Sequence, residues 1–307
     1  MAASTSSLIS TSKDLREFLS TIESDNSLYL DLEGKSLSRD GTITLVTMLI
    51  HPQKVTRVVD VLTLGKSAFE IESVEGRSLK SILEDHEVQK YVWDVRNDAD
   101  ALWAHFQVGL AGVTDIQLLE NASRPDWIDK TKLCGLDKAV QYDVKLGFMD
   151  RERWLRTKRE VRNLMSKDIF SQRPLAPSTL QYCVNDVAHL PALQKFYMGR
   201  VNPTWLVKAH EESKRRLADA RSPEYKPQSP GKALGPWGGG STTKLTLEEM
   251  AEVMWEREMD DKEPEDFLWD LEYDEQEDEF DYWDDDVRCS ADVNDFGGAF
   301  DSCWDKY

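Results

Sequence analysis

The sequence predicts an α/β domain built on a mixed five-stranded sheet flanked by helices, followed by a disordered acidic C-terminal tail. Strand-like segments first follow one another at short spacing, then alternate with helical segments, and finally give way to helical segments alone. The charge is equally uneven, because residues 245–307 hold 25 acidic and 4 basic residues, a net charge of −21, whereas residues 1–244 carry a net charge of +2. A near-neutral body of this length can bury an ordinary hydrophobic core, so we place the fold there.

The predicted domain begins after a short N-terminal segment. Residues 1–12 are expected to be flexible, since they are rich in Ser and Thr and lack a periodic apolar pattern. Residues 13–22 place apolar side chains at helical spacing, with Ser12 as the expected N-cap. The folded domain is therefore expected to span residues 13–220.

Three strands are expected next, at residues 28–34, 43–51 and 55–62. The second is almost entirely apolar, which favours a central position in the sheet. Only a few residues separate consecutive strands, so we expect them to pair antiparallel as a meander.

Beyond the meander, strands and helices alternate. Residues 79–83 are expected to be helical, 90–93 a strand, 99–106 a helix and 113–116 a strand, with a further helix through Asn121. Alternation of this kind is typical of parallel pairing. The remaining helices are expected at residues 136–142, 151–164, 178–197 and 204–220.

Two segments follow the expected helices. Residues 221–243 are dense in Pro, Gly and Ser and are predicted to form a linker. Residues 244–307 combine acidic side chains with scattered aromatic ones, and we expect this tail to be largely disordered.

Composition excludes several classes of protein. No run of about 18 apolar residues exists, which excludes a transmembrane helix and indicates no membrane partner. The 4 cysteines form no C-x-x-C pair and are too few for a disulfide framework. The N-terminus lacks the basic and apolar regions of a secretory signal. We therefore expect a cytoplasmic or nuclear protein.

The first candidate site residues are Asp31 and Glu33. They lie two apart on an expected strand, so both side chains project to one face. Two carboxylates on one face repel each other unless a cation lies between them, and Mg²⁺ or Mn²⁺ takes oxygen ligands. The alternative interpretation is a solvated turn at the end of the strand.

A second pair, Tyr182 and Asp186, lies four residues apart on an expected helix and so on one helical face. The carboxylate could bind an ion while the hydroxyl orients a water molecule. A third group, residues 94–100, holds Asp94, Asp98 and Asp100 where a strand gives way to a helix. We expect Asp98 to cap the helix, Asp94 to cap or form a salt bridge, and Asp100 to face back toward the edge of the sheet.

The order of these motifs resembles that of DEDDy 3′–5′ exonuclease domains, within the ribonuclease H-like superfamily. It is most similar to the RNase D, Werner-type and Egalitarian-like members. Asp31-Leu32-Glu33-Gly34 resembles the first motif, and Val92-Trp93-Asp94-Val95-Arg96 leading to Asp100-Ala101-Leu102 resembles the second. Arg173-Pro174-Leu175, placed before Tyr182 and Asp186, resembles the third.

The resemblance covers roughly residues 13–200 and implies a ribonuclease H-like fold. It also implies hydrolysis of phosphodiesters from the 3′ end by two divalent ions, Mg²⁺ or Mn²⁺, with release of nucleoside 5′-monophosphates. The implied metal ligands are Asp31, Glu33, Asp100 and Asp186, with Tyr182 positioning the water. The rival hypothesis is a catalytically silent RNA-binding scaffold with the same fold.

A basic stretch is the candidate nucleic-acid interface. Cationic side chains hold phosphates and aromatic side chains stack on bases, which suits single-stranded RNA or DNA. A solvated helix face is the alternative, because acidic residues are interspersed. The candidate residues are Arg151, Arg153, Arg156, Lys158, Arg159, Arg162 and Arg173.

The acidic tail admits three interpretations. It could be a solubilising segment, it could occupy the domain's own basic groove, or it could bind a protein partner. The opposite charges of tail and body favour the second as the sharpest hypothesis.

Overall fold

The meander forms the antiparallel part of the sheet, as expected. Its strands are β2 (Ser27–Glu33), β3 (Leu45–His51) and β4 (Val55–Asp60), and β3 pairs antiparallel with both neighbours. This computed structural model describes residues 7–237 of the chain. The burial of all but the last residue of β3 explains its central position, since both its faces are covered.

The parallel part of the sheet follows from the alternation of strands and helices. β5 (Gln89–Val92) pairs parallel with β2, and β6 (Val113–Asp115) pairs parallel with β5. The connection between β5 and β6 runs through helix α5 (Arg96–Phe106). The full strand order is β1-β4-β3-β2-β5-β6, which confirms a mixed sheet but with six strands rather than five.

The sixth strand, β1 (Ser7–Ile9), pairs parallel with β4 at the edge of the sheet. The expectation of a flexible segment over residues 1–12 is therefore wrong for residues 7–12, because Ile9 is buried and the backbone pairs with β4. Helix α1 (Ser12–Leu19) follows directly. Its N-cap is Thr11 rather than Ser12, since the Thr11 hydroxyl accepts a hydrogen bond from the backbone N–H of Asp14.

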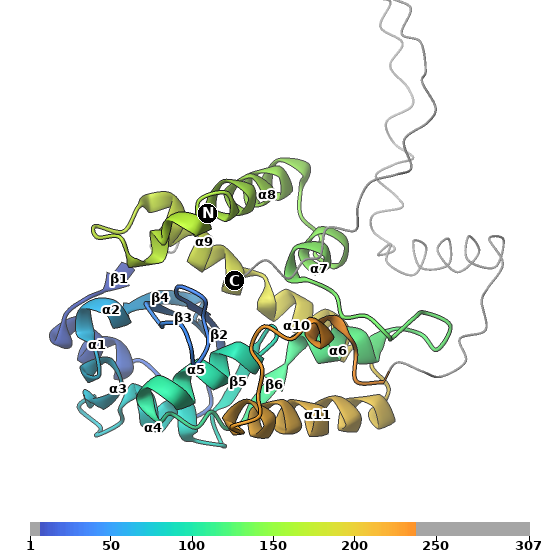
Figure 1. The fold of residues 1–307 in the computed structure, drawn as a ribbon, viewed down its shortest axis with the longest axis horizontal. Coiled ribbons are helices and arrows are strands. Elements are labelled where there is room, and N and C mark those ends of the chain that lie inside the picture. The colour runs from blue at the N-terminus through green and yellow to red at the C-terminus, as the bar shows by residue number, and fades with distance from the viewer. Residues whose placement is uncertain (1–6, 238–307) are drawn as a thin grey trace, which may run out of the picture. The chain divides into compact units, whose positions relative to one another are not determined.

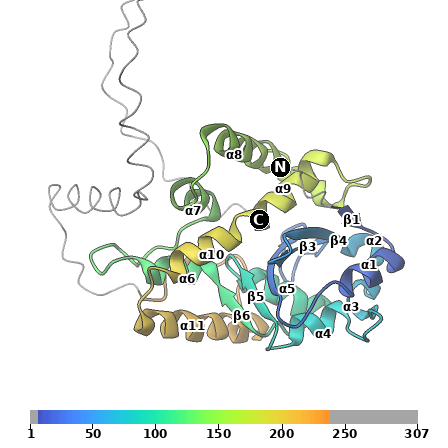
Figure 2. The same cartoon turned by 180° about the vertical axis from the view of Figure 1, so that it is seen from behind.

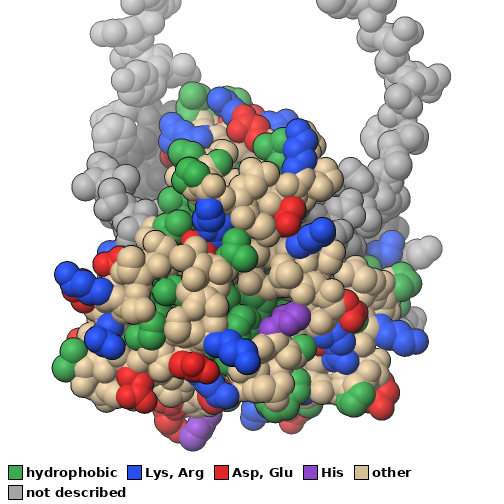
Figure 3. All heavy atoms as spheres, turned by 60° about the vertical axis from the view of Figure 1, so that its left-hand side comes forward, with side chains coloured by type: hydrophobic (Ala, Val, Ile, Leu, Met, Phe, Trp, Pro, Cys, Tyr) green, Lys and Arg blue, Asp and Glu red, His purple; other side chains and the backbone are tan. Residues whose placement is uncertain are grey.

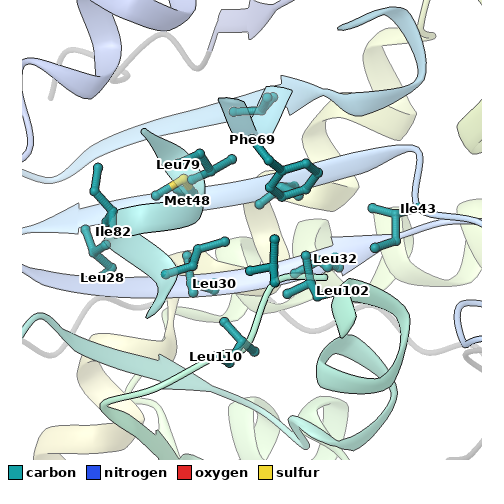
Figure 4. Close-up of a cluster of buried hydrophobic side chains, with 14 of the residues drawn as sticks. Leu28, Leu30, Leu32, Ile43, Met48, Phe69, Leu79, Ile82, Leu102 and Leu110 are labelled. Atoms are coloured by element: carbon teal, nitrogen blue, oxygen red, sulfur yellow. The ribbon is translucent and has the colours of Figure 1, made fainter. Parts of the chain in front are cut away.

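Alternate residues of β2 face two different layers. Leu30 and Leu32 pack into the larger core together with residues of α1, α4 (Leu79–Glu84) and α5. Figure 4 shows them with Leu79 of α4 and Leu102 of α5. The intervening residues of β2 face the opposite layer. Two short helices, α2 (Val61–Leu64) and α3 (Ser67–Glu70), complete the first layer.

The second layer consists of helices from the later part of the described chain. In Figures 1 and 2, α8 and α9 lie on the side of the sheet opposite α3 and α4. Helix α9 packs against β2, β3 and β4. Helix α11 packs instead against α5, α6 and β6. The helices after β6 are α6 (Ile116–Ser123), α7 (Leu136–Asp143), α8 (Phe148–Arg162), α9 (Pro177–Ala188), α10 (Leu190–Met198) and α11 (Pro203–Arg221), with short 3₁₀ turns at Met165–Lys167, Ile169–Ser171 and Pro230–Ala233.

One helix of the expected set is in fact two. The pattern over residues 178–197 indicates a continuous helix, but α9 ends at Ala188 and α10 begins at Leu190. Pro191 occupies the first turn of α10. Proline has no backbone N–H and clashes with the preceding turn, so it begins a new helix here.

Residues 222–237, which we name the C-terminal strap, are not a linker. The Tyr225 hydroxyl and the Lys232 ammonium each donate a hydrogen bond of 2.6 Å to the side-chain carbonyl of Asn97 on α5. A Cβ atom on Gly235 would lie 2.2 Å from the carbonyl oxygen of Lys130, so this glycine permits close backbone approach. The linker prediction is therefore wrong over residues 221–237, and the rest of it lies outside the described residues.

The acidic tail, residues 244–307, also lies outside the described residues. Among residues 7–237, no helix has both the length and the apolar character that crossing a bilayer requires.

Candidate metal centre

Asp31 and Glu33 lie on the face of β2 that meets α9. Asp31 is paired across the sheet with Thr47, and Glu33 with Leu45. Leu45 belongs to a small core with Tyr182 of α9, and residues directly opposite in an antiparallel pair share a face. Both carboxylates are buried, with exposed fractions of 3% and 4%.

Helix α9 brings the second pair of residues to the same face. It starts at Pro177, which is preorganised for the first helical position. Tyr182 and Asp186 lie one turn apart, and both are buried. Cys183 lies between them in the sequence and is buried. Burial raises the pKa of its thiol well above the ordinary value, and the negative charges of Glu33, Asp186 and Asp31 raise this pKa further.

Three of the expected ligands converge. Asp31, Glu33 and Asp186 each offer a carboxylate oxygen, and these oxygens all lie within 4.8 Å of one another. Three buried carboxylates at this spacing repel one another strongly unless a cation neutralises them. We refer to these three residues as the carboxylate cluster.

The donor set of the cluster fits a hard divalent cation. Carboxylate oxygens are the ligands that Mg²⁺ and Mn²⁺ prefer. The hydroxyl of Thr47, opposite Asp31, is buried and has no hydrogen-bond partner among residues 7–237. Buried hydroxyls in proteins normally have a partner, so the Asp31 side of the cluster suits a further polar ligand such as a metal-bound water.

Asp100, the fourth expected ligand, lies elsewhere. One of its carboxylate oxygens accepts a hydrogen bond of 2.7 Å from the backbone N–H of Arg39, and the other accepts one of 2.6 Å from Arg39 Nε. Its side chain is fully buried in this ion pair. The prediction of Asp100 as a metal ligand is therefore corrected: it anchors the loop that follows β2.

Asp98 is a second buried acid on α5, and it also lies outside the carboxylate cluster. Leu102 packs in the same core as Leu30 and Leu32 of β2, and Figure 4 shows Leu102 beside Leu32. Asp98 lies one turn before Leu102, so the two residues are neighbours along α5. Asp100 lies about 200° around the helix from Asp98, on a different side.

The expected capping role of Asp98 is also wrong. Residue Val95 precedes the first turn of α5 and makes no side-chain capping bond. The backbone N–H groups of Asp94 and Val95 instead donate to the carboxylate of Asp115. Asp94 forms a salt bridge with Arg96 at 2.6 Å, which is one of its two expected roles.

Lys158 was expected on a nucleic-acid surface, but it is buried beside the cluster. Its side chain is 3% exposed and its ammonium forms an ion pair with Asp186. The ammonium also lies 4.5 Å from the centroid of the Tyr182 ring. The sequence analysis did not separate Lys158 from the other basic residues of α8, because it considered only their charge. The spacing of Lys158 from Trp154 and Val161 could have separated it, since these three residues lie on the buried face of the helix.

Arg173, another predicted nucleic-acid-binding residue, forms an ion pair within the domain instead. Its Nε and terminal nitrogen donate to the two oxygens of Asp60, at 2.7 and 2.6 Å. Bidentate pairing of this kind fixes the segment before α9 to the end of β4.

The other basic residues of the stretch lie on or near the surface. Arg153, Arg156, Arg159 and Arg162 are exposed, and Arg151 is half-buried. Arg162 is paired with Asp137 of α7, whereas Arg153 lies 3.2 Å from Asp150 on its own helix. Phe148 and Met149, at the start of α8, are exposed as well.

Solved structures with the same fold include two of RNase D and one of RRP6. RNase D of Trypanosoma brucei in complex with RNA U12 has a TM-score of 0.62 and 21% identity, over 82% of this chain and 86% of that one. Escherichia coli RNase D has a TM-score of 0.52 and 18% identity, over 71% and 51%. The catalytic core of RRP6 from T. brucei has a TM-score of 0.52 and 17% identity, over 71% and 53%.

Comparison with curated proteins gives no match. The family model described as 3′–5′ exonuclease matches residues 7–198, which include β2, α5 and α9 with all the candidate ligands. This match covers more than half of the chain. The chain therefore belongs to the 3′–5′ exonuclease family, in its DEDDy-type branch, as the motifs around Asp31, Tyr182 and Asp186 indicated.

Proposed function

We propose that this protein removes nucleotides one at a time from the 3′ end of single-stranded nucleic acid and releases nucleoside 5′-monophosphates. The observation that carries the proposal is the convergence of the buried carboxylates of Asp31, Glu33 and Asp186. Membership of the 3′–5′ exonuclease family supports the same direction of attack.

The proposed metal ligands are Asp31, Glu33, Asp98 and Asp186. These residues would hold two divalent cations, Mg²⁺ or Mn²⁺, which stabilise the attacking and leaving oxygens of a phosphodiester when bound. Burial of the carboxylates supports this assignment, because a cluster of buried acids is stable at neutral pH only with compensating positive charge.

Tyr182 is the proposed positioning group for the attacking water. Its ring is buried beside Phe170, in a small core that also contains Leu45, and this packing restricts its rotation. Tyr182 and Asp186 share a face of α9, so a water near the Asp186 carboxylate lies within reach of the phenol. A phenol hydroxyl can donate a hydrogen bond to such a water and hold it in place.

The proposed substrate surface is the exposed side of α8. Its arginines suit phosphates, and Phe148 offers a face on which a base can stack. Figure 3 shows basic, hydrophobic and acidic side chains interspersed on the upper part of the face in view. Because one solved neighbour is a complex with RNA, we take RNA as the first substrate to test, and DNA as the competitor.

The test uses oligonucleotides labelled at the 5′ or the 3′ end, with Mg²⁺ or Mn²⁺ and with chelator. We expect a ladder from the 5′ label, labelled mononucleotide from the 3′ label, and no product with chelator. Asp31→Ala and Asp186→Ala are expected to abolish turnover while the circular dichroism spectrum is retained. Asp31→Ala removes a repelling carboxylate. In Asp186→Ala the buried Lys158 ammonium keeps Asp137 as a partner, at 3.6 Å.

Binding of RNA without any mononucleotide release by the wild type would support the scaffold hypothesis instead. Turnover at the wild-type rate in either alanine variant would contradict the site assignment. The cytoplasmic or nuclear location remains a prediction from the sequence.

A further inference from the structure

A cationic side chain of the protein itself lies beside the carboxylate cluster. Lys158 enters from α8, and its ammonium is paired with Asp186. Its side chain is 3% exposed, and it is lined by the rings of Tyr182 and Trp154, whose centroids lie 4.5 and 5.3 Å from the nitrogen. The ammonium therefore occupies one side of a carboxylate that the proposed function assigns to a metal ion.

A second acid lies on the other side of the ammonium. Asp137 Oδ1, in the first turn of α7, is 3.6 Å from Lys158 Nζ. Asp137 is not part of the carboxylate cluster. Lys158 thus lies between one carboxylate inside the cluster and one outside it.

We propose that Lys158 is a displaceable counter-ion, which neutralises Asp186 in the metal-free protein and moves its pairing to Asp137 when the cluster takes up a divalent cation. This inference rests on the proposed metal-dependent function. Competition between the ammonium and the metal for Asp186 lowers metal affinity, and the nearby Asp137 limits that loss.

The physical reason for the second partner is the cost of a stranded charge. A buried ammonium that loses its only carboxylate is strongly destabilised, and the aromatic rings around Lys158 compensate only a part of this. With Asp137 within 3.6 Å, a small rotation of the side chain restores an ion pair. Metal uptake therefore exchanges one pair for another rather than breaking one.

Two substitutions are expected to act in opposite directions. Lys158→Met keeps the length of the side chain and removes the competitor, so the dissociation constant for Mn²⁺ should fall by about tenfold. Asp137→Asn removes the second partner, so Lys158 is held on Asp186 and the dissociation constant should rise by about tenfold.

Metal binding is measured without reference to turnover, from the rise in melting temperature of the full chain as Mn²⁺ is titrated into chelator-treated protein. Lys158→Met should melt below the wild type in chelator, because the cluster has lost its cation, and should gain more on Mn²⁺ addition. Lys214→Met is the matched control: it makes the same change on an exposed part of α11, which packs against α5, α6 and β6, and should leave the affinity unchanged.

Outcomes of this experiment separate the two proposals. If Mn²⁺ does not stabilise the wild type, the metal-dependent function fails and the inference fails with it. If Mn²⁺ stabilises the wild type but Lys158→Met binds it no more tightly, only the counter-ion role is overturned. If Lys158→Met does not fold in chelator, Asp137→Asn decides alone, and an affinity equal to or above that of the wild type overturns the inference.

Discussion

At the scale of single residues, two acids on one helix illustrate what spacing can and cannot predict. Asp31 with Glu33, and Tyr182 with Asp186, follow strand and helix periods, so the sequence predicts that each pair shares a face. Asp98 and Asp100 lie two apart on a helix, where the choice between them depends on which side faces the sheet. The ion pair of Asp100 with Arg39 engages that carboxylate, which leaves Asp98 as the proposed ligand.

Exchanging each of these two acids for asparagine should separate catalysis from stability. Asp98→Asn is expected to lower turnover by at least about a hundredfold with little effect on unfolding, as for a lost metal ligand. Asp100→Asn is expected to cost about 3 kcal/mol in the free energy of unfolding, because the buried pair with Arg39 is broken. Urea denaturation and mononucleotide release, measured on both variants, check the two effects.

The reverse pattern would restore Asp100 as the ligand. In that case Asp100→Asn would lose turnover without losing stability, and Asp98→Asn would retain both. Arg39→Gln serves as the control, since it breaks the same pair from the other side and should resemble Asp100→Asn in stability.

Lys158 shows the limit of reasoning from single residues. A lysine on a basic helix is typical of a solvated or nucleic-acid-binding face, and nothing in its neighbours in sequence reveals a partner 28 residues away. Its ion pair with Asp186 is a product of the packing of α8 on α9. Contacts of this kind depend on tertiary structure and are not encoded in local periodicity.

At the scale of elements, the long and periodic segments were predictable. The meander and the parallel strands follow from apolar runs and connection lengths, and their pairing is confirmed. β1 was missed because its three residues are too few for a periodic signal, and only the free edge of β4 makes them a strand. The division between α9 and α10 was available in the sequence as Pro191.

The segment before α9 provides a pH-dependent prediction. Burial raises the pKa of the Asp60 carboxyl, but hydrogen bonds from Arg173 and Thr63 outweigh burial and hold this pKa below its ordinary value. A lowered pKa means that the pairing contributes stability above about pH 4, where an unfolded aspartate is ionised, and loses it as pH falls through the folded pKa.

Arg173→Gln should therefore destabilise the protein by about 3 kcal/mol at pH 7 and by clearly less near pH 3. The part that remains at pH 3 reflects the hydrogen bonds that Arg173 donates to the carbonyls of Phe170 and Gln172, which do not titrate. Urea denaturation at both pH values measures the difference. Arg153→Gln, which breaks an exposed pair, is the control and should change stability little at either pH. An equal cost of Arg173→Gln at both pH values would show that the Asp60 charge is not involved.

At the scale of the whole molecule, amino-acid composition predicts the distribution of charge but not whether a Pro- and Gly-rich segment packs against the domain. Pro and Gly in residues 222–237 indicate a flexible linker, yet burial lowers the pKa of Lys232 to about 8, and its ammonium is bonded to Asn97. The glycine at 235 serves close backbone approach rather than flexibility. Composition cannot distinguish these uses, because both require a residue without a side chain.

The charge asymmetry between residues 245–307, at −21, and residues 1–244, at +2, leads to the last prediction. If the acidic tail competes with substrate for α8, then deleting residues 245–307 should raise turnover of short oligonucleotides. The gain should be largest at low salt, because the screening length is about 30 Å at 0.01 M and about 10 Å at 0.1 M.

Removing positive charge from α8 tests whether the tail acts through this helix. Arg153→Gln, Arg156→Gln and Arg159→Gln, combined in one protein, should raise KM and weaken its dependence on salt, because fewer counterions are released on binding. In this background the deletion of residues 245–307 should have little further effect, since the proposed binding surface of the tail is gone. Turnover and KM of the four proteins, measured from 0.02 to 0.3 M salt, give the coupling between α8 and the tail. A tail deletion that accelerates the substituted protein as much as the wild type would place the action of the tail elsewhere, and one that accelerates neither would leave solubility or partner binding as its role.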